Sequence, residues 1–288
     1  MSLQLPASLT PSKVSAFKEC ALAFRLSAID KLPEPPSLQA FKGTVVHRAL
    51  ELLMWEEPQG SRSLEAAMSR LERALDELLV SEEGLALGLE GQALLDLRAD
   101  AAELVRNYFV LEDPDQVRVL GTELRLQVEV GESRLRLRGI IDRLELDAHG
   151  DLVVTDYKTG RAPGLSQEGL RLGGVHFYAF LCEQFLGRRP ARVQLLHLRE
   201  PIAICSTPSD QSIHGLERQA LAIWAAVKRA CSEEDFRPRP GSHCSWCGYH
   251  AYCPAQGGDL SQLPVASRRP AEGHDGQAAL ALSLQAGA

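Results

Sequence analysis

Hydrophobic positions in the first third of the chain recur with the 3.6-residue period of an α-helix. Residues 64–78 show this clearly, because their apolar side chains return every three or four positions. Thr10 and Pro11 are typical of a helix start, and the proline-rich segment 32–36 is expected to end the first helix. The pattern predicts helices over residues 11–28, 61–80 and 90–111, and one that begins at Gly43.

The period then changes to the two-residue alternation of β-strands. Residues 124–130 and 135–141 alternate apolar and polar side chains, and a turn at residues 147–150 leads to an apolar strand at 152–155. We therefore expect at least three strands, mostly antiparallel. Further along, the sequence predicts a buried helix over residues 175–187, strands near 193–196 and 202–204, and a helix over 209–231.

Composition limits the classes of protein that this pattern can form. The chain has 288 residues, 45% of them hydrophobic, which is enough for one large domain or two small ones. No apolar run approaches the ~18 residues of a membrane span. The N-terminus lacks the basic and apolar regions of a signal peptide. We therefore expect a cytoplasmic protein with no membrane partner.

The formal net charge of −7 argues against a protein that coats nucleic acid through its bulk charge. It leaves room for a local basic groove in an acidic body. For the alternating arginines of residues 134–138, the alternative is a solvated strand face. The basic residues that could supply such a groove are Arg138, Arg143, Lys158 and Arg161, with a further cluster at Arg188, Arg189 and Arg192.

Seven cysteines in a chain without an export signal favour reduced thiols over disulfides. Three of them, Cys244, Cys247 and Cys253, form a C-x2-C-x5-C pattern that is typical of a metal site. Cys20 is a candidate fourth ligand, with His243 and His250 nearer in sequence. Four thiolates suit tetrahedral Zn²⁺ or an iron–sulfur cluster, and the spacing does not decide between them. The packing cysteines are expected to be Cys182, Cys205 and Cys231.

An acidic pair and a lysine form the second candidate site. Asp156 and Lys158 are two residues apart on a predicted strand, so they share a face. If residues 148–150 form a three-residue loop with Gly150 left-handed, Asp142 lies opposite Asp156. Two carboxylates supply the oxygen ligands that Mg²⁺ needs, and the lysine could orient a water or stabilise charge on a phosphate. The alternative is a surface salt-bridge cluster.

His47 is a further candidate ligand, on the helix that begins at Gly43. It lies among apolar residues, where a histidine is often a core residue with satisfied hydrogen bonds. Its neutral imidazole could instead complete the metal shell. Glu51 lies one turn further along and could orient the ring.

Together these segments resemble the RecB-like branch of the PD-(D/E)XK nuclease superfamily, and more closely its iron–sulfur-containing exonucleases. The resemblance covers roughly residues 8–256. The matching segments are Leu9–Cys20, Gly43–His47, Gly139–Arg143, the D-x-K segment Asp156–Gly160, and Cys244, Cys247 and Cys253.

The resemblance implies an α/β fold with a restriction-endonuclease-like core, in which a mixed central sheet is flanked by helices. A helical region over about residues 43–111 would precede a sheet core over about 120–232. The implied boundaries are an N-terminal arm at 1–9, one nuclease domain over 10–256, and a disordered tail at 257–288. The cysteine segment 244–253 would be joined to Cys20.

The resemblance also implies roles for individual residues. Asp142 and Asp156 would ligate Mg²⁺ or Mn²⁺, with His47 as a further ligand, and Lys158 would position or activate the attacking water. Glu123, on the preceding strand, could approach this site. The four cysteines would hold a [4Fe-4S] cluster, with structural Zn²⁺ as the alternative.

Tyr178 matches the tyrosine of the family's Q-x-x-x-Y helix, which helps to place DNA. The glutamine of that motif would fall at position 174, where this sequence has Gly174. This departure weakens the expectation that the helix places DNA, and with it the expected rate of cleavage.

The function implied is that of a metal-dependent DNA exonuclease that hydrolyses phosphodiester bonds. Single-stranded DNA is the expected substrate, in repair or recombination, with a possible helicase or repair partner. One alternative is a catalytically weak, cluster-stabilised DNA-binding protein or a nuclease subunit of a helicase–nuclease complex. Another is a zinc-stapled protein unrelated to nucleic acid.

Overall fold

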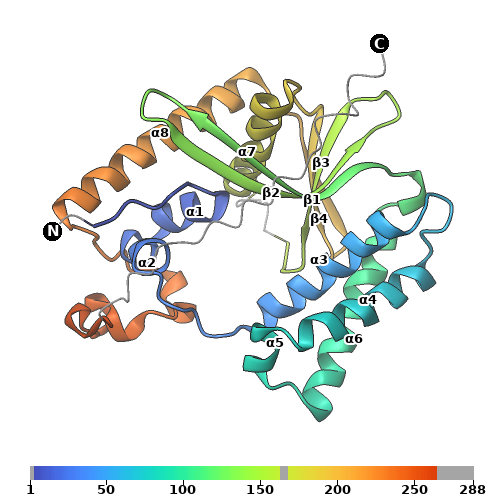
Figure 1. Ribbon diagram of the computed structural model, residues 1–288, viewed down its shortest axis with the longest axis horizontal. Coiled ribbons are helices and arrows are strands. Elements are labelled where there is room, and N and C mark those ends of the chain that lie inside the picture. Colours follow the sequence, from blue (N-terminus) through green and yellow to red (C-terminus); the bar gives the residue numbers. More distant parts are fainter. Residues whose placement is uncertain (1–2, 163–167, 265–288) are drawn as a thin grey trace.

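A computed structural model describes residues 3–162 and 168–264. Its centre is a five-stranded sheet with the strand order β1-β2-β3-β4-β5 (Figure 1). β3 and β4 are parallel, and the other neighbouring strands are antiparallel. The strands are β1 (Arg118–Val130), β2 (Leu135–Leu146), β3 (Leu152–Lys158), β4 (Arg192–His197) and β5 (Ile202–Ser206). This mixed sheet flanked by helices confirms the predicted fold class.

Helices cover both faces of the sheet, as Figure 1 shows. The α-helices are α1 (Pro11–Glu19), α2 (Ala21–Phe24), α3 (Leu38–Glu56), α4 (Leu64–Leu79), α5 (Glu82–Leu87), α6 (Gly91–Leu111), α7 (Glu168–Leu186) and α8 (Asp210–Glu233). The short helical segments are Arg25–Ile29, Pro114–Gln116, Ser242–Trp246, His250–Tyr252, Pro254–Gln256 and Leu260–Gln262. No helix in the described ranges is long and apolar enough to cross a membrane.

Two hydrophobic cores lie on opposite faces of the sheet. On β3, Val154 packs with α7 and α8, whereas Tyr157 packs with α3, α4 and α6. Such alternation is expected of a strand that is buried on both faces. The helical lobe of α3 to α6 is therefore attached to the sheet through residues next to Asp156 and Lys158.

Serines set the starts of the helices in this lobe. The Ser37 side chain accepts a hydrogen bond from Ala40 N, so α3 begins before the predicted Gly43. Ser63 caps α4 in the same way. The short helix α5, whose N-cap is Ser81, was not predicted. Each long helix of the lobe, α3, α4 and α6, buries one apolar stripe, as the sequence pattern predicts.

The first predicted helix, over residues 11–28, is not continuous. It is interrupted at Cys20, whose backbone is extended at φ −155° and ψ 112°. The reason is a contact with a distant segment, because the Cys20 Sγ accepts a hydrogen bond from the backbone N–H of Arg239. The residues that follow form α2 and a π-helical turn at Arg25–Ile29.

Both ends of the described chain are bound to the rest of the molecule. Leu9 is fully buried and exchanges backbone hydrogen bonds with β2, at a point where β3 does not cover that strand's edge. Structure also continues past residue 256, where the backbone N–H groups of Gly258 and Asp259 donate to the cysteine segment. Residues 265–288, most of the expected tail, lie outside the described residues.

Candidate functional site

The β2–β3 hairpin brings two aspartates together. Its loop is residues 148–150, closed by a hydrogen bond from Asp147 N to Asp151 O and with Gly150 at φ 81°. The last registered pair is Arg143 with Thr155, so the next step along the hairpin places Asp142 beside Asp156. This is the register that the sequence predicts.

Glu123 reaches the same place through a local irregularity in β1. Its φ is +48°, a left-handed conformation that is costly for a residue other than glycine. The neighbouring pairs Thr122–Arg143 and Leu124–Ile141 are in register, but Glu123 and Asp142 between them are not paired. Such irregularities re-aim side chains near functional sites. No pattern in the sequence reports this backbone conformation.

His47, Glu123 and Asp142 form one possible metal-binding group. One ligand atom from each lies within 4.8 Å of the other two. The His47 Nε2 donates a hydrogen bond of 3.1 Å to the Tyr157 carbonyl oxygen. The Nδ1 lies 3.5 Å from the Asp142 Oδ2. A neutral imidazole oriented by a carbonyl is a common arrangement among histidine ligands.

The prediction that Glu51 orients the His47 ring is wrong. Glu51 accepts a 2.8 Å hydrogen bond from Arg48, one of its neighbours on α3, and it is the carbonyl of Tyr157 that orients the imidazole. Glu51 instead adds negative charge near Glu123. The role of the Tyr157 carbonyl could not be predicted from the sequence, because every residue has a backbone carbonyl.

The carboxylates crowd one another in a poorly solvated place. Burial raises the pKa of Glu123 to about 7, and the neighbouring Asp142 adds to this increase. Burial also raises the pKa of Asp142 to about 6, a shift that His47 opposes and Asp156 increases. Buried acidic groups that repel one another are stabilised by a cation. The donor set of carboxylate oxygens and a neutral imidazole therefore fits a divalent ion.

Asp156 and Lys158 lie beside this group and contact each other. Asp156 is buried and forms an ion pair with the Lys158 ammonium, whose side chain is 43% exposed. The site thus combines a buried carboxylate with a cation that substrate can reach.

Tyr178 extends toward the aspartates from α7. Burial and the charges of Asp156 and Asp142 raise the pKa of its hydroxyl. Gly139 makes this approach possible, because a Cβ there would lie 3.2 Å from the Tyr178 ring and 2.7 Å from Leu181. Gly174, in place of the family's glutamine, is exposed, and a Cβ there would meet no atom within 4 Å.

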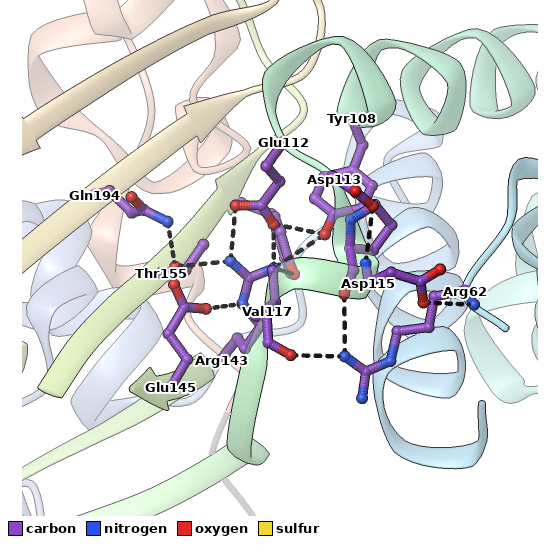
Figure 2. Close-up of polar contacts among 12 residues, drawn as sticks. Arg62, Tyr108, Glu112, Asp113, Asp115, Val117, Arg143, Glu145, Thr155 and Gln194 are labelled. Carbon is purple, nitrogen blue, oxygen red and sulfur yellow. Dashed lines mark hydrogen bonds and ion pairs between the residues drawn. The ribbon is translucent and has the colours of Figure 1, made fainter. Parts of the chain in front are cut away.

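Arg143 does not reach solvent, so its predicted part in a basic groove is wrong. Figure 2 shows its guanidinium enclosed by acidic and hydroxyl groups. It is fully buried and forms ion pairs with Glu112 and Glu145. It also donates hydrogen bonds to the hydroxyls of Tyr108 (3.1 Å), Tyr157 (2.9 Å) and Thr155 (3.2 Å).

This network fixes Tyr157, the residue between Asp156 and Lys158. Its hydroxyl is held by Arg143, its N–H donates to the Asp142 Oδ2 at 2.7 Å, and its carbonyl accepts from His47. A second buried arginine, Arg62, donates to the carbonyls of Pro114 and Val117 in the connection between α6 and β1 (Figure 2). Both arginines lie on the face of the sheet that the helical lobe covers, where Tyr157 packs.

The cysteine pattern forms a second site, away from the carboxylates. Cys20, Cys244, Cys247 and Cys253 line one pocket, together with His243 and His250. Burial and the charges of the other three cysteines raise the pKa of the Cys247 thiol. Backbone N–H groups of Arg239 and Gly241 donate to the sulfurs of Cys20 (3.5 Å) and Cys244 (3.4 Å). Four cysteines from the two ends of the described chain therefore line one pocket.

The remaining cysteines differ from one another. Cys182 and Cys231 are buried, as predicted for packing residues. Cys205 is exposed on β5, so its predicted packing role is wrong. β5 is an edge strand, and only part of it is covered, which the alternating sequence does not reveal.

Comparison with known families identifies the class of protein that carries this arrangement. The sequence profile of the PD-(D/E)XK nuclease superfamily matches residues 8–254. The match includes the carboxylates, the lysine, and all four cysteines of the pocket. The chain belongs to the PD-(D/E)XK nuclease superfamily. Comparison with curated proteins gives no significant match.

Comparison with solved structures finds matches over most of the chain. The crystal structure of SSO0001 has a TM-score of 0.40 and 12% identity, over 88% of this chain and 89% of that chain. A protein of Eubacterium rectale, described as a candidate exonuclease, has a TM-score of 0.45 and 8% identity, over 84% of this chain and 87% of that chain. Similarities at this level carry no information about activity.

Proposed function

We propose that this nuclease is a metal-dependent DNA exonuclease that acts on single strands. The observation that carries the proposal is the meeting of His47, Glu123 and Asp142 beside the Asp156–Lys158 pair. Superfamily membership makes nucleic acid the substrate class. A group of carboxylates next to a partly exposed ammonium suits the hydrolysis of a phosphodiester.

The residues that would hold Mg²⁺ or Mn²⁺ are Asp142, Glu123 and His47, with Asp156 as a further oxygen ligand. When bound, such an ion polarises a phosphoryl group and lowers the pKa of a bound water. The protein's own contribution is positional. Lys158 can hold a water or stabilise charge on the phosphate, and the fixed backbone of Tyr157 keeps His47 and Asp142 in place.

A cleavage assay tests this proposal. Single-stranded DNA labelled at its 5′ or 3′ end is incubated with the protein and Mg²⁺ or Mn²⁺, with a chelator, or with the Lys158→Ala variant purified in the same way. We expect stepwise shortening from one end with metal and none in the other two reactions. Cleavage that persists in Lys158→Ala, or no cleavage with either metal, contradicts the proposal.

Gly174 favours a second candidate, a catalytically weak protein that binds DNA. The position is exposed, and a Cβ there would meet no atom within 4 Å. The same assay separates the candidates. Retention of DNA without metal-dependent shortening supports binding alone.

We also propose that the four cysteines hold a [4Fe-4S] cluster, with Zn²⁺ as the alternative. Their common pocket and the two N–H donors to sulfur support a thiolate-bound metal. The cysteine segment follows α8, and Cys20 lies between α1 and α2, so the metal would join the two ends of the nuclease domain. Its role would be structural.

Cys20→Ala is expected to lower the melting temperature as much as Cys247→Ala, because either change removes a ligand from the same metal site. Both variants should lose metal and any absorbance near ~400 nm that thiolate-bound iron gives. The exposed Cys205→Ala is the matched control and should keep both. If Cys20→Ala melts like the control with full metal content, Cys20 is not a ligand. Colourless protein with stoichiometric zinc after anaerobic purification would favour Zn²⁺.

A further inference from the structure

One face of the β1–β2 hairpin continues from the carboxylates into solvent. Beyond Glu123 and Asp142, the next registered pairs are Arg125 with Ile140 and Gln127 with Arg138. These four side chains are exposed, because the residues between them turn to the other face and pack in the core with α7. Ile140 lies between the two arginines and is 42% exposed.

The arginines on this hairpin fall into two groups. Arg134 and Arg136, near its tip, form ion pairs with Glu129 at 2.7 and 3.4 Å. Arg125 and Arg138, nearer the carboxylates, form no ion pair with any carboxylate in residues 3–162 and 168–264. The charge of Arg125 reaches Glu123, where it opposes the increase in the pKa of that carboxyl.

Two lysines from the N-terminal segment add to the charge of Arg138. The backbone N–H of Arg138 donates to the Leu9 carbonyl, which places α1 beside β2. Lys13 is half-buried there and donates to the Ser8 carbonyl at 3.1 Å. Burial and the nearby charges of Arg138 and Lys31 lower the pKa of Lys13. Three cations that repel one another are stabilised by an anion.

We propose that this face, made of Arg125, Arg138, Ile140, Lys13 and Lys31, is the path by which a single nucleic-acid strand reaches the carboxylates. The inference rests on the proposed function and adds a binding surface to it. Arg125 would bind a phosphate next to the reacting one. Arg138 lies four residues from Asp142, about 13 Å further along the strand, and would bind a later phosphate with the two lysines.

Ile140 favours a single strand over a duplex. It lies between the two arginines, where it offers an apolar surface to a base. Bases in a single strand expose their faces and pack on side chains, whereas bases in a duplex are stacked inside and leave only phosphates for such a surface.

Fluorescence polarisation of a labelled oligothymidylate, measured in a chelator so that no cleavage occurs, tests the surface. The Arg125→Gln/Arg138→Gln double variant is compared with Arg134→Gln/Arg136→Gln, which removes the same charge from the same hairpin. We expect the first pair to weaken binding by at least about tenfold. It should also reduce the slope of log Kd against log salt by about 1.4, or ~0.7 for each lost phosphate contact. The control pair should change Kd by less than about twofold.

Equal weakening by the two pairs would mean a general charge effect and would overturn the inference, as would no change with either pair. A hairpin duplex that loses as much affinity as the single strand would overturn the assignment to a single strand. Binding is measured without metal, so its outcome does not depend on whether the protein cleaves DNA. A failure of the proposed function can therefore be distinguished from a failure of this inference.

Discussion

Asp142→Asn is expected to abolish cleavage and, at pH 8 in a chelator, to raise the melting temperature. The carboxylate is largely buried, close to Glu123 and Asp156, and its pKa is raised to about 6. Asparagine has nearly the same shape and can still accept the Tyr157 N–H, but it carries no charge. The substitution thus removes an unfavourable charge together with a metal ligand.

The sign of the pH dependence follows from the direction of this shift. A carboxyl whose pKa is higher in the folded protein destabilises the fold as pH rises from about 4 to about 6, and the full cost is present above that range. Two pKa units correspond to about 3 kcal/mol, so a gain of about 1–3 kcal/mol is expected for Asp142→Asn at pH 8. Little difference should remain at pH 4.

Thermal melting at both pH values, with and without Mg²⁺, checks this prediction. Mg²⁺ should stabilise the wild type at pH 8 and leave the variant unchanged, and cleavage should fall at least about 100-fold. Asp147→Asn is a control of opposite sign, because backbone N–H groups of Asp151 and His149 lower the pKa of Asp147. That variant should melt lower at pH 8. A lower melting point for Asp142→Asn at pH 8, or retained cleavage, would contradict the assignment.

Much of the acidic site could be predicted because it depends on local register. A three-residue loop with a glycine fixes which residues of a hairpin are opposite, so the pairing of Asp142 with Asp156 follows from the sequence. The fold class also follows, since the hydrophobic period changes from 3.6 to 2 where the helical lobe ends. Both inferences use neighbours in sequence only.

The parts that could not be predicted depend on distant contacts. Glu123 approaches the site as expected, but through a left-handed backbone that no side-chain pattern encodes. Cys20 interrupts a helix because its sulfur meets the segment near Arg239. Ile141 and Leu144, three apart, pack in the same core, so the alternation of β2 shifts between them. The shift turns Arg143 toward the helical lobe, where Tyr108 and Glu112 bury it.

Arg143→Leu is expected to cost about 3–5 kcal/mol of folding free energy, the largest loss of stability among the changes considered. The guanidinium is fully buried between Glu112 and Glu145, which would keep their charges without a partner. Arg143→Lys keeps the charge but cannot donate to so many groups at once, so an intermediate loss is expected. Denaturant titration of both variants measures the cost.

The network can be distinguished from simple loss of packing by removing its charges together. Arg143→Leu combined with Glu112→Gln and Glu145→Gln should recover part of the lost stability, because no unpaired carboxylate remains. Arg134→Leu is the control, since Arg134 is 80% exposed and its ion pair should contribute at most about 1 kcal/mol. A cost below about 1 kcal/mol for Arg143→Leu, or no recovery in the triple variant, would mean that these charges do not hold Tyr157 in place on β3. The recovered triple variant should still cleave more slowly than the wild type, because the Tyr157 hydroxyl has lost its anchor.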